Sequence, residues 1–185
     1  MKNEEQLRKM FANINDWLKF AEAKNLGLLT LNAAIVFGVL KADLTVSNTV
    51  EWITYYLLVP LAIISFIIGL ISVFPILSAI EKGKKIKGGI DWLSNIIDKE
   101  EPFVNIHFYG YLKNIDKEEF ESEYLVKTKS TVAFSEFEKE LASQILYNSR
   151  ITTLKYQFFK VGAFLLFVGI CMTGIAFFIS HFFKI

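Results

Sequence analysis

Three long runs of apolar residues, separated by polar segments, dominate the sequence. The last run, residues 161–183, contains no Asp, Glu, Lys or Arg. About twenty apolar residues are enough to cross the roughly 30 Å hydrocarbon layer of a bilayer. Upstream of this run, Ser135 stands three residues before Glu138, the spacing of a capping box, and no proline follows it. The pattern predicts one continuous helix over residues 135–185, which begins in water and crosses a membrane over about residues 159–183.

The N-terminal residues combine a polar and an apolar part in the same way. Apolar residues recur at steps of three and four from Leu7 to Ala21, which predicts an amphipathic helix over residues 1–24 on the cytoplasmic side. The apolar run that follows predicts a first transmembrane span over residues 25–41.

A polar external turn at residues 42–51 leads to the second predicted span, residues 52–80. Trp52 stands at its start, as in the aromatic belts of membrane proteins. Pro60 and Pro75 each remove a helical hydrogen bond, which predicts kinks in this span.

Between the second and third spans, residues 81–134 form a small polar module. Within it we expect a helix at residues 91–99 and, from the alternation of apolar and polar side chains, a strand or extended segment at residues 103–111. Asp116 and Glu119 are spaced to cap a further helix that runs through Leu125. The predicted fold is an all-α membrane protein with three transmembrane helices and a small cytoplasmic α or α+β module.

Basic residues flank the spans unequally. They occur through the N-terminal segment and again directly after the second span, whereas Lys41, at the end of the first span, is the one basic residue beside the turn between the first two spans. The positive-inside rule therefore predicts a multi-pass membrane protein with the N-terminus in the cytoplasm and the C-terminus outside.

Composition excludes several other classes of protein. Hydrophobic residues make up 53% of the 185 positions, yet the formal net charge is only +1, which argues against binding nucleic acid. One cysteine and two histidines build neither a disulfide framework nor a structural zinc site. Because no nucleophile, base and orienting acid cluster in the polar module, we expect neither an enzyme, nor a metal, nor a cofactor.

Seven residues in or beside the polar module are candidates for binding a ligand: Lys84, Lys85, Lys87, His107, Tyr109, Arg150 and Lys155. The lysine cluster could hold a phosphate, or it could set the membrane topology and meet anionic lipid. The histidine and its aromatic neighbours could stack on a base or fill a small core. Arg150 could clamp a phosphate, and a salt bridge to Asp16 or Glu22 is the structural alternative.

A second set of residues is polar or small and falls in or beside the predicted spans: Lys24, Asn25, Asn32, Gly38, Gly69, Gly169 and Thr173. The asparagines could line a permeation path or form interhelical hydrogen bonds. Lys24 could extend to the cytoplasmic interface or pair with an acidic residue. Small residues four apart allow close helix approach and oligomers, and they occur at Ala34 and Gly38, Ser65 and Gly69, and Gly169 and Thr173.

Short sequence elements occur in a fixed order around these spans. They are Glu22-Ala23-Lys24 with Asn32, then Phe108-Tyr109-Gly110 with Tyr124, and finally Leu141-Ala142, Gln144-Ile145, Ser149 and Lys155-Tyr156. Together they resemble the membrane-spanning effector family of Pycsar, a bacterial anti-phage system. The chain departs from the family pattern at Glu22, where aspartate is expected, and at Tyr109, where a second phenylalanine is expected.

The resemblance implies an effector that a cyclic mononucleotide, cyclic UMP or cyclic CMP, activates after a partner cyclase has made it during infection. Such an effector impairs the integrity of the inner membrane and stops growth of the infected cell. Three spans in one subunit are too few to enclose a pore, so activity implies a homo-oligomer. The alternative is a membrane scaffold or sensor that docks a protein partner through its cytoplasmic module without a ligand.

Overall fold

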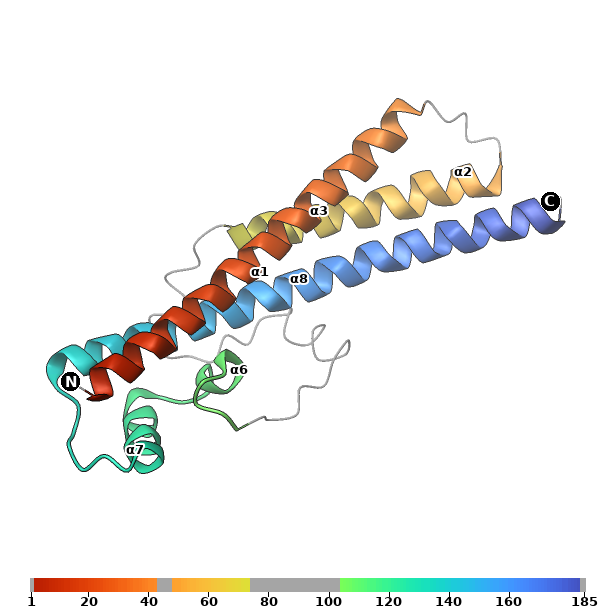
Figure 1. Cartoon of the computed structure of the whole chain (residues 1–185). Coiled ribbons are helices and arrows are strands. Elements are labelled where there is room, and N and C mark those ends of the chain that lie inside the picture. The colour runs from red at the N-terminus through yellow and green to blue at the C-terminus, as the bar shows by residue number, and fades with distance from the viewer. Residues whose placement is uncertain (1, 43–47, 74–103, 184–185) are drawn as a thin grey trace. The chain divides into compact units, whose positions relative to one another are not determined.

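The computed structural model describes residues 2–42, 48–73 and 104–183, and in these ranges it is built from helices without a strand (Figure 1). The helices are α1 (Lys2–Lys41), α2 (Thr49–Ile53), the π-helical turn η1 (Thr54–Leu58), α3 (Val59–Val73), α6 (Tyr109–Leu112), α7 (Lys117–Thr128) and α8 (Glu136–Phe183). Among the described residues, three stretches are long and apolar enough to cross a membrane, namely Asn3–Lys41, Thr49–Val73 and Glu136–Phe182. The predicted all-α membrane fold is confirmed, including a last helix that continues from a polar part into an apolar part. The expected helix at residues 91–99 and the kink at Pro75 lie outside the described residues.

The described chain divides into two compact units. The head unit contains residues 2–22 and 104–156, and the membrane unit contains residues 23–42, 48–73 and 157–183. Helices α1 and α8 contribute residues to both units, because the division falls inside each helix.

The core of the head unit forms where one face of α1 meets α7 and the polar half of α8. Leu7 and Ile14 of α1 are fully buried, as are Phe120 of α7 and Ile145 of α8. These α1 residues belong to the three- and four-residue repeat seen in the sequence, so the repeat marks the face that packs on the head unit. The ring of Tyr124 completes the core, 5.2 Å from that of Phe134 in an edge-on arrangement.

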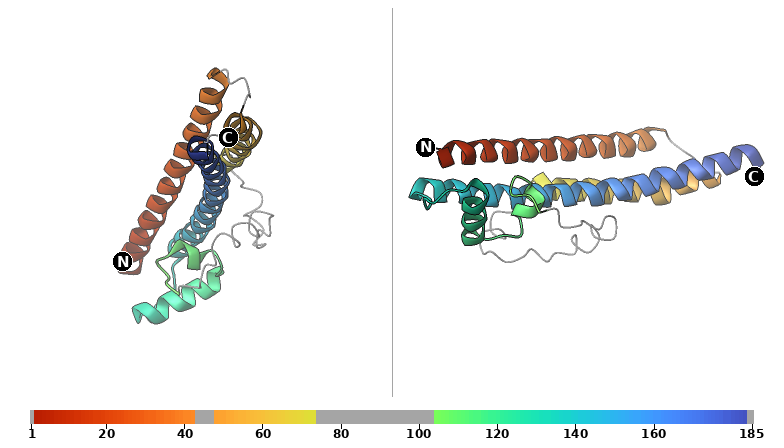
Figure 2. Two further views of the ribbon diagram at one scale, coloured as in Figure 1. Left: turned by 90° about the vertical axis from the view of Figure 1, so that its right-hand side faces the viewer. Right: turned by 60° about the horizontal axis from the view of Figure 1, so that its bottom comes forward.

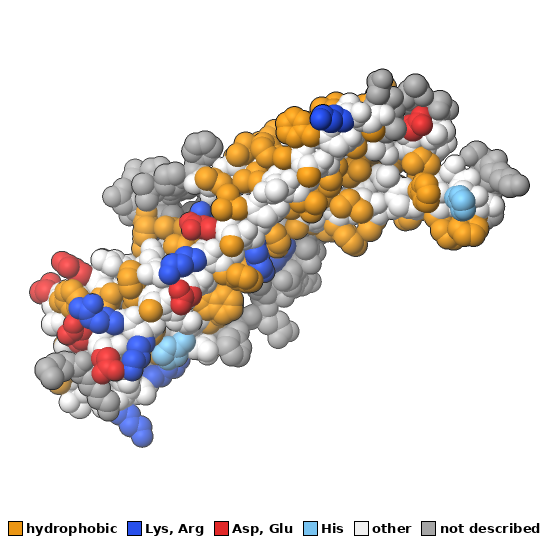
Figure 3. Space-filling view, turned by 45° about the horizontal axis from the view of Figure 1, so that its top comes forward, with side chains coloured by type: hydrophobic (Ala, Val, Ile, Leu, Met, Phe, Trp, Pro, Cys, Tyr) orange, Lys and Arg blue, Asp and Glu red, His pale blue; other side chains and the backbone are white. Residues whose placement is uncertain are grey.

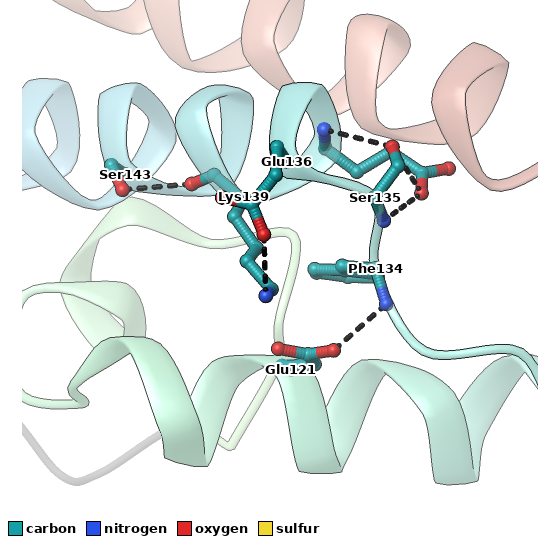
Figure 4. A network of polar contacts seen from close by, with 7 residues as sticks. Glu121, Phe134, Ser135, Glu136, Lys139 and Ser143 are labelled. Carbon is teal, nitrogen blue, oxygen red and sulfur yellow. Dashed lines mark hydrogen bonds and ion pairs between the residues drawn. The ribbon is translucent and has the colours of Figure 1, made fainter.

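Capping interactions fix where α7 and α8 begin, and both agree with the sequence spacing. The carboxylate of Asp116 accepts from the backbone N–H of Glu119 at 2.8 Å. At α8 the backbone N–H of Ser135 donates to Glu138 at 2.8 Å, and the backbone N–H of Glu138 donates back to the Ser135 hydroxyl at 3.3 Å. The capping box is therefore formed, and the N–H of Phe134 beside it donates to Glu121 of α7 (Figure 4). These bonds satisfy N–H groups that a helix start leaves without partners.

The expected strand at residues 103–111 is wrong over its described part, residues 104–111. The side chain of Asn105 accepts from the N–H of His107 at 2.8 Å, and the backbone oxygen of Asn105 accepts from Phe108 at 2.9 Å. An asparagine that bonds its own backbone two residues on makes a turn, which here leads directly into α6. The alternation of apolar residues therefore reflects one buried side chain, Ile106, and not a sheet.

In the membrane unit α1, α3 and α8 pack around Leu28, Leu58, Ala62 and Leu166 (Figure 2). The backbone N–H of Val59 bonds to Thr54 five residues back, so a π turn stands directly before Pro60. Proline cannot donate and its ring crowds the preceding turn, which accounts for the wider turn at this position. Large hydrophobic side chains cover the outward faces of these helices (Figure 3).

Candidate functional site

A cavity of about 550 Å³ opens in the head unit between α1, the turn at residues 104–107 and α7. Its wall on α1 consists of Gln6, Lys9, Met10 and Asn13, and the turn contributes Val104, Asn105, Ile106 and His107. The wall on α7 consists of Tyr124, Lys127 and Thr128. Ligand sites in proteins have volumes of about 300–1,000 Å³, so the cavity has the size of a small-molecule site.

Two lysines give the cavity its positive charge, one on each helix. Lys9 pairs with Glu5 at 2.6 Å, and Lys127 lies 3.7 Å from Glu123. Both pairs join residues four apart on one helix. The side chains of Lys9 and Glu5 are 74% and 70% exposed, and exposed pairs of this kind contribute little net stability, whereas those of Lys127 and Glu123 are 43% and 28% exposed. The Lys9 ammonium group can therefore change partner at small cost when an anion enters, and the Lys127 ammonium group lies 3.7 Å from its carboxylate, beyond hydrogen-bond length.

Neutral polar groups line the rest of the cavity and also hold its walls together. The hydroxyl of Tyr124 donates to the side chain of Gln6 at 2.9 Å and lies 3.2 Å from the backbone oxygen of Asn3. The amide of Asn13 donates to the backbone oxygen of His107 at 3.4 Å. These bonds connect α1 to both other walls, so the cavity depends on the position of α1.

The structure places the seven predicted ligand residues differently from one another. His107 lines the cavity, whereas Tyr109 stacks on Tyr156 with ring centroids 5.2 Å apart and lies 5.7 Å from the ring of Trp17. Glycine suits position 110, because a Cβ there would lie 2.5 Å from the Phe108 ring. Residues 84, 85 and 87 lie outside the described residues.

Arg150 and Lys155 have different partners on the head unit. The guanidinium of Arg150 donates to the backbone oxygens of Lys113 and Ile115 at 3.4 and 3.2 Å, where it satisfies carbonyls after the end of α6. The ion pair to the first helix is made by Lys155, which lies 3.3 Å from Glu22. Lys155 therefore makes a salt bridge to α1, whereas the guanidinium of Arg150 bonds main-chain oxygens, and phosphate binding by Arg150 stays a prediction.

The membrane unit contains a buried polar node that joins its three helices. Asn32 of α1 donates its amide N–H to the hydroxyl of Ser65 on α3 at 2.8 Å, and that hydroxyl donates to the backbone oxygen of Gly162 on α8 at 2.8 Å. Asn32 and Ser65 are fully buried. The Oδ1 atom of Asn32 has no hydrogen-bond partner among the described residues. An unsatisfied buried acceptor costs about 1–3 kcal/mol. The oxygen of Asn32 therefore destabilises the packed arrangement of the three spans by about this amount.

Of the other predicted polar and small residues of the spans, some lie at close contacts between helices, and others contact a ring or their own helix. Asn25 is buried, and Gly69 and Gly169 allow close packing, since a Cβ would meet Leu29 at 2.9 Å and Leu58 at 3.0 Å respectively. Lys24 extends over the ring of Phe159, with its nitrogen 5.4 Å from the ring centroid, and Thr173 bonds back to its own helix.

Ala34 and Gly38 do not pack against other residues that the structure describes. Both are exposed, and a Cβ at Gly38 would meet no atom within 4 Å. The C-terminal end of α1 diverges from α8, which leaves this face of α1 uncovered in the described chain (Figures 1 and 2).

Most residues that line the cavity, Lys9, Lys127 and Gln6 among them, were missed by reasoning from the sequence, and so was the role of Ser65. Lys127 and Gln6 each lie on an amphipathic helix, within four residues of a buried residue. This position indicates the edge of the buried face but does not identify the residues that they contact. Ser65 was recognised only as a small residue. A hydroxyl in an apolar span is itself a signal, because hydrocarbon offers it no hydrogen-bond partner.

Beside the cavity, Tyr111 gives a prediction about pH. Its hydroxyl donates a short hydrogen bond to Glu123, and this bond raises the pKa of Tyr111 to about 12. The neutral phenol is favoured in the folded state. The stabilisation is therefore complete below pH 10, the ordinary tyrosine value, and is lost as the pH rises towards about 12. We expect ultraviolet titration of phenolate, with Tyr111→Phe subtracted, to show one late-titrating tyrosine. Glu123→Gln should return that pKa towards 10, and an unchanged late titration would contradict the assignment.

The match to a known protein family covers residues of both units. The sequence matches the model of the Pycsar effector protein domain over residues 6–180, which includes residues of all three long helices. No curated protein and no solved structure matches the chain. The predicted resemblance is therefore confirmed: the chain is a multi-pass membrane protein that belongs to the Pycsar effector family of anti-phage proteins.

Proposed function

We propose that the protein is an inner-membrane effector that a cyclic nucleotide, cyclic UMP or cyclic CMP, switches on during phage infection. A partner cyclase makes the nucleotide, which reaches the effector by diffusion. The effector then rearranges or assembles and impairs the membrane, so that the infected cell stops growing. The observation that carries this proposal is the family match over residues 6–180, which includes both the head unit and all three spans.

Two features of the chain support a ligand-controlled membrane activity. The head unit has a cavity of mixed polar and apolar character, and its α1 wall belongs to the helix that also contains the first span. The membrane unit has a polar node at Asn32 and Ser65 that is buried in apolar surroundings. Polar groups inside spans are costly and commonly mark functional positions.

Orientation and assembly complete the proposal. The basic residues of the N-terminal segment favour an N-terminus in the cytoplasm, where a cyclase would release its product, and a C-terminus outside. The exposed pair Ala34 and Gly38 offers a surface on which a second copy could approach closely. The active species is then a homo-oligomer, since three spans are too few to surround a pore.

Leakage from liposomes tests the proposed function. The purified protein is reconstituted in dye-loaded vesicles, and cyclic UMP, cyclic CMP, cyclic AMP and cyclic GMP are added separately. We expect rapid dye release with one cyclic pyrimidine nucleotide and none with the purine nucleotides or without nucleotide. Protein-free vesicles control for an effect of the nucleotide on lipid.

Two results would contradict this function. Equal leakage with and without nucleotide would mean that the protein damages membranes without a signal. Absence of leakage with every nucleotide, in vesicles where protease protection shows correct insertion and crosslinking shows oligomers, would favour the scaffold alternative. A pull-down without nucleotide should then recover a stable protein partner.

A further inference from the structure

We propose that the head cavity is the binding site of the activating nucleotide, with Lys9 and Lys127 holding its phosphate and the amide side chains of the cavity reading its base. This proposal rests on the proposed function and adds to it the location of the signal site. The cavity differs from the lysine cluster at residues 82–87, which is the other basic region of the sequence between the second and third spans.

The charge of the cavity fits a phosphodiester. A cyclic mononucleotide carries one negative charge on its phosphate, and two ammonium groups from α1 and α7 flank the cavity. Glu5 and Glu123 currently neutralise these groups from outside the set of lining residues. An entering phosphate would compete with Glu5, whose side chain is 70% exposed, and with Glu123, which also accepts a hydrogen bond from the Tyr111 hydroxyl. The exchange is therefore easier than placing a new charge in an apolar core.

The neutral lining fits the edge of a pyrimidine. Gln6, Asn13 and Asn105 each use one half of the amide in a bond to the protein, and an amide carries both donors and acceptors. Uracil and cytosine present oxygen acceptors, a ring nitrogen and a group at position 4 that is an acceptor in one base and a donor in the other. Met10 and Ile106 provide apolar surface for the ring faces.

The position of the cavity also gives binding a physical effect. Its walls come from α1 and α7, which the hydroxyl of Tyr124 already connects through Gln6. A ligand held by lysines of both helices adds further bonds between the same two elements. Binding therefore acts on α1, the helix that also contains the first span.

Calorimetry on the full-length protein in detergent tests the site. The ligands are cyclic UMP and cyclic CMP, with cyclic AMP, cyclic GMP and inorganic phosphate for comparison. Replacing both lysines by glutamine, Lys9→Gln with Lys127→Gln, should weaken binding of the cyclic pyrimidine about tenfold to a hundredfold, since bonds to charged groups are lost. Lys139→Gln is the matched control, because Lys139 also pairs with a glutamate on its own helix but does not line the cavity.

A second variant tests for a gain that structural damage does not produce. Glu123→Gln removes the carboxylate that competes for Lys127, so the affinity for nucleotide should rise. In parallel, a photoreactive cyclic pyrimidine should crosslink to peptides that contain residues 6–13, 104–107 or 124–128. Unchanged melting temperatures of the variants establish that each remains folded.

The outcomes separate the site from the function. If the wild-type protein binds a cyclic pyrimidine and the double variant binds it with unchanged affinity, or if crosslinking is confined to residues 82–87, the site assignment is wrong and the function stands. If the wild-type protein binds none of the nucleotides, both proposals fail. Weakened binding in the double variant, with an unaffected Lys139→Gln control, supports the site.

Discussion

Replacing Asn32 with leucine is expected to leave the protein folded and inserted but to lower its growth-arresting activity about fivefold to 150-fold. In the structure Asn32 donates to Ser65, while its own oxygen has no partner among the described residues. That oxygen disfavours the packed arrangement by about 1–3 kcal/mol and favours any rearranged state that supplies a donor. Leucine has no unpaired oxygen, so the substitution removes this destabilisation and favours the packed state of the spans. Colony counts after induction of the effector with its cyclase measure the change.

The matched control is Thr30→Leu, two residues earlier on α1. Thr30 is exposed, and its hydroxyl bonds only the backbone of Leu26 on its own helix among the contacts described. This control adds the same apolar side chain without touching the node and should retain activity. Membrane fractionation shows whether both variants insert. Full growth arrest by Asn32→Leu would exclude the node from the mechanism.

Replacing Phe120 with alanine is expected to have the largest effect on stability. Phe120 is fully buried and contacts the rings of Tyr124 and Phe134, at centroid distances of 6.1 and 6.4 Å. Removing a buried phenylalanine costs about 3–5 kcal/mol, and small domains have only about 5–15 kcal/mol in total. We expect the head unit to lose its fold and its nucleotide binding. Limited proteolysis should then cleave residues 104–134 much faster than in the wild type.

The control for this prediction is Val126→Ala on the same helix. Val126 is 74% exposed, so its truncation should change stability by less than about 0.5 kcal/mol. Cleavage of Phe120→Ala at the wild-type rate, with unchanged nucleotide binding, would show that the head unit does not depend on this core.

Sequence patterns anticipated the long helices and their starts because these depend on local chemistry. Apolar runs identify spans, and the caps at Asp116 and Ser135 need only a side chain that accepts from an N–H three residues ahead. The prediction of a strand around Ile106 was wrong for a related reason. Alternation of apolar and polar residues is shared by strands and by short turns with one buried residue, and the side chain of Asn105 decided for the turn.

The sites were less predictable, because they depend on which helices meet and at what rotation. The sequence indicated that Asn32 faces protein, yet nothing near it in sequence names Ser65 or the backbone of Gly162 as partners. A salt bridge to α1 was considered for Arg150, yet Lys155 on the same stretch of α8 makes it. Their roles followed only once the end of α6 was seen to offer main-chain oxygens to Arg150.

The π turn at Thr54–Leu58 sets the phase of the second span. It holds about one more residue than an α-helical turn, and one residue corresponds to a rotation of about 100°. Trp52 before the turn and Tyr56 inside it are exposed, with tilted rings whose centroids lie 5.2 Å apart, and downstream Ser65 points inward to Asn32. Deleting one residue here while the aromatic pair kept its place would turn Ser65 away from Asn32. The number of residues between the aromatic pair and the polar node therefore determines the packing of the membrane unit as much as the identity of those residues does.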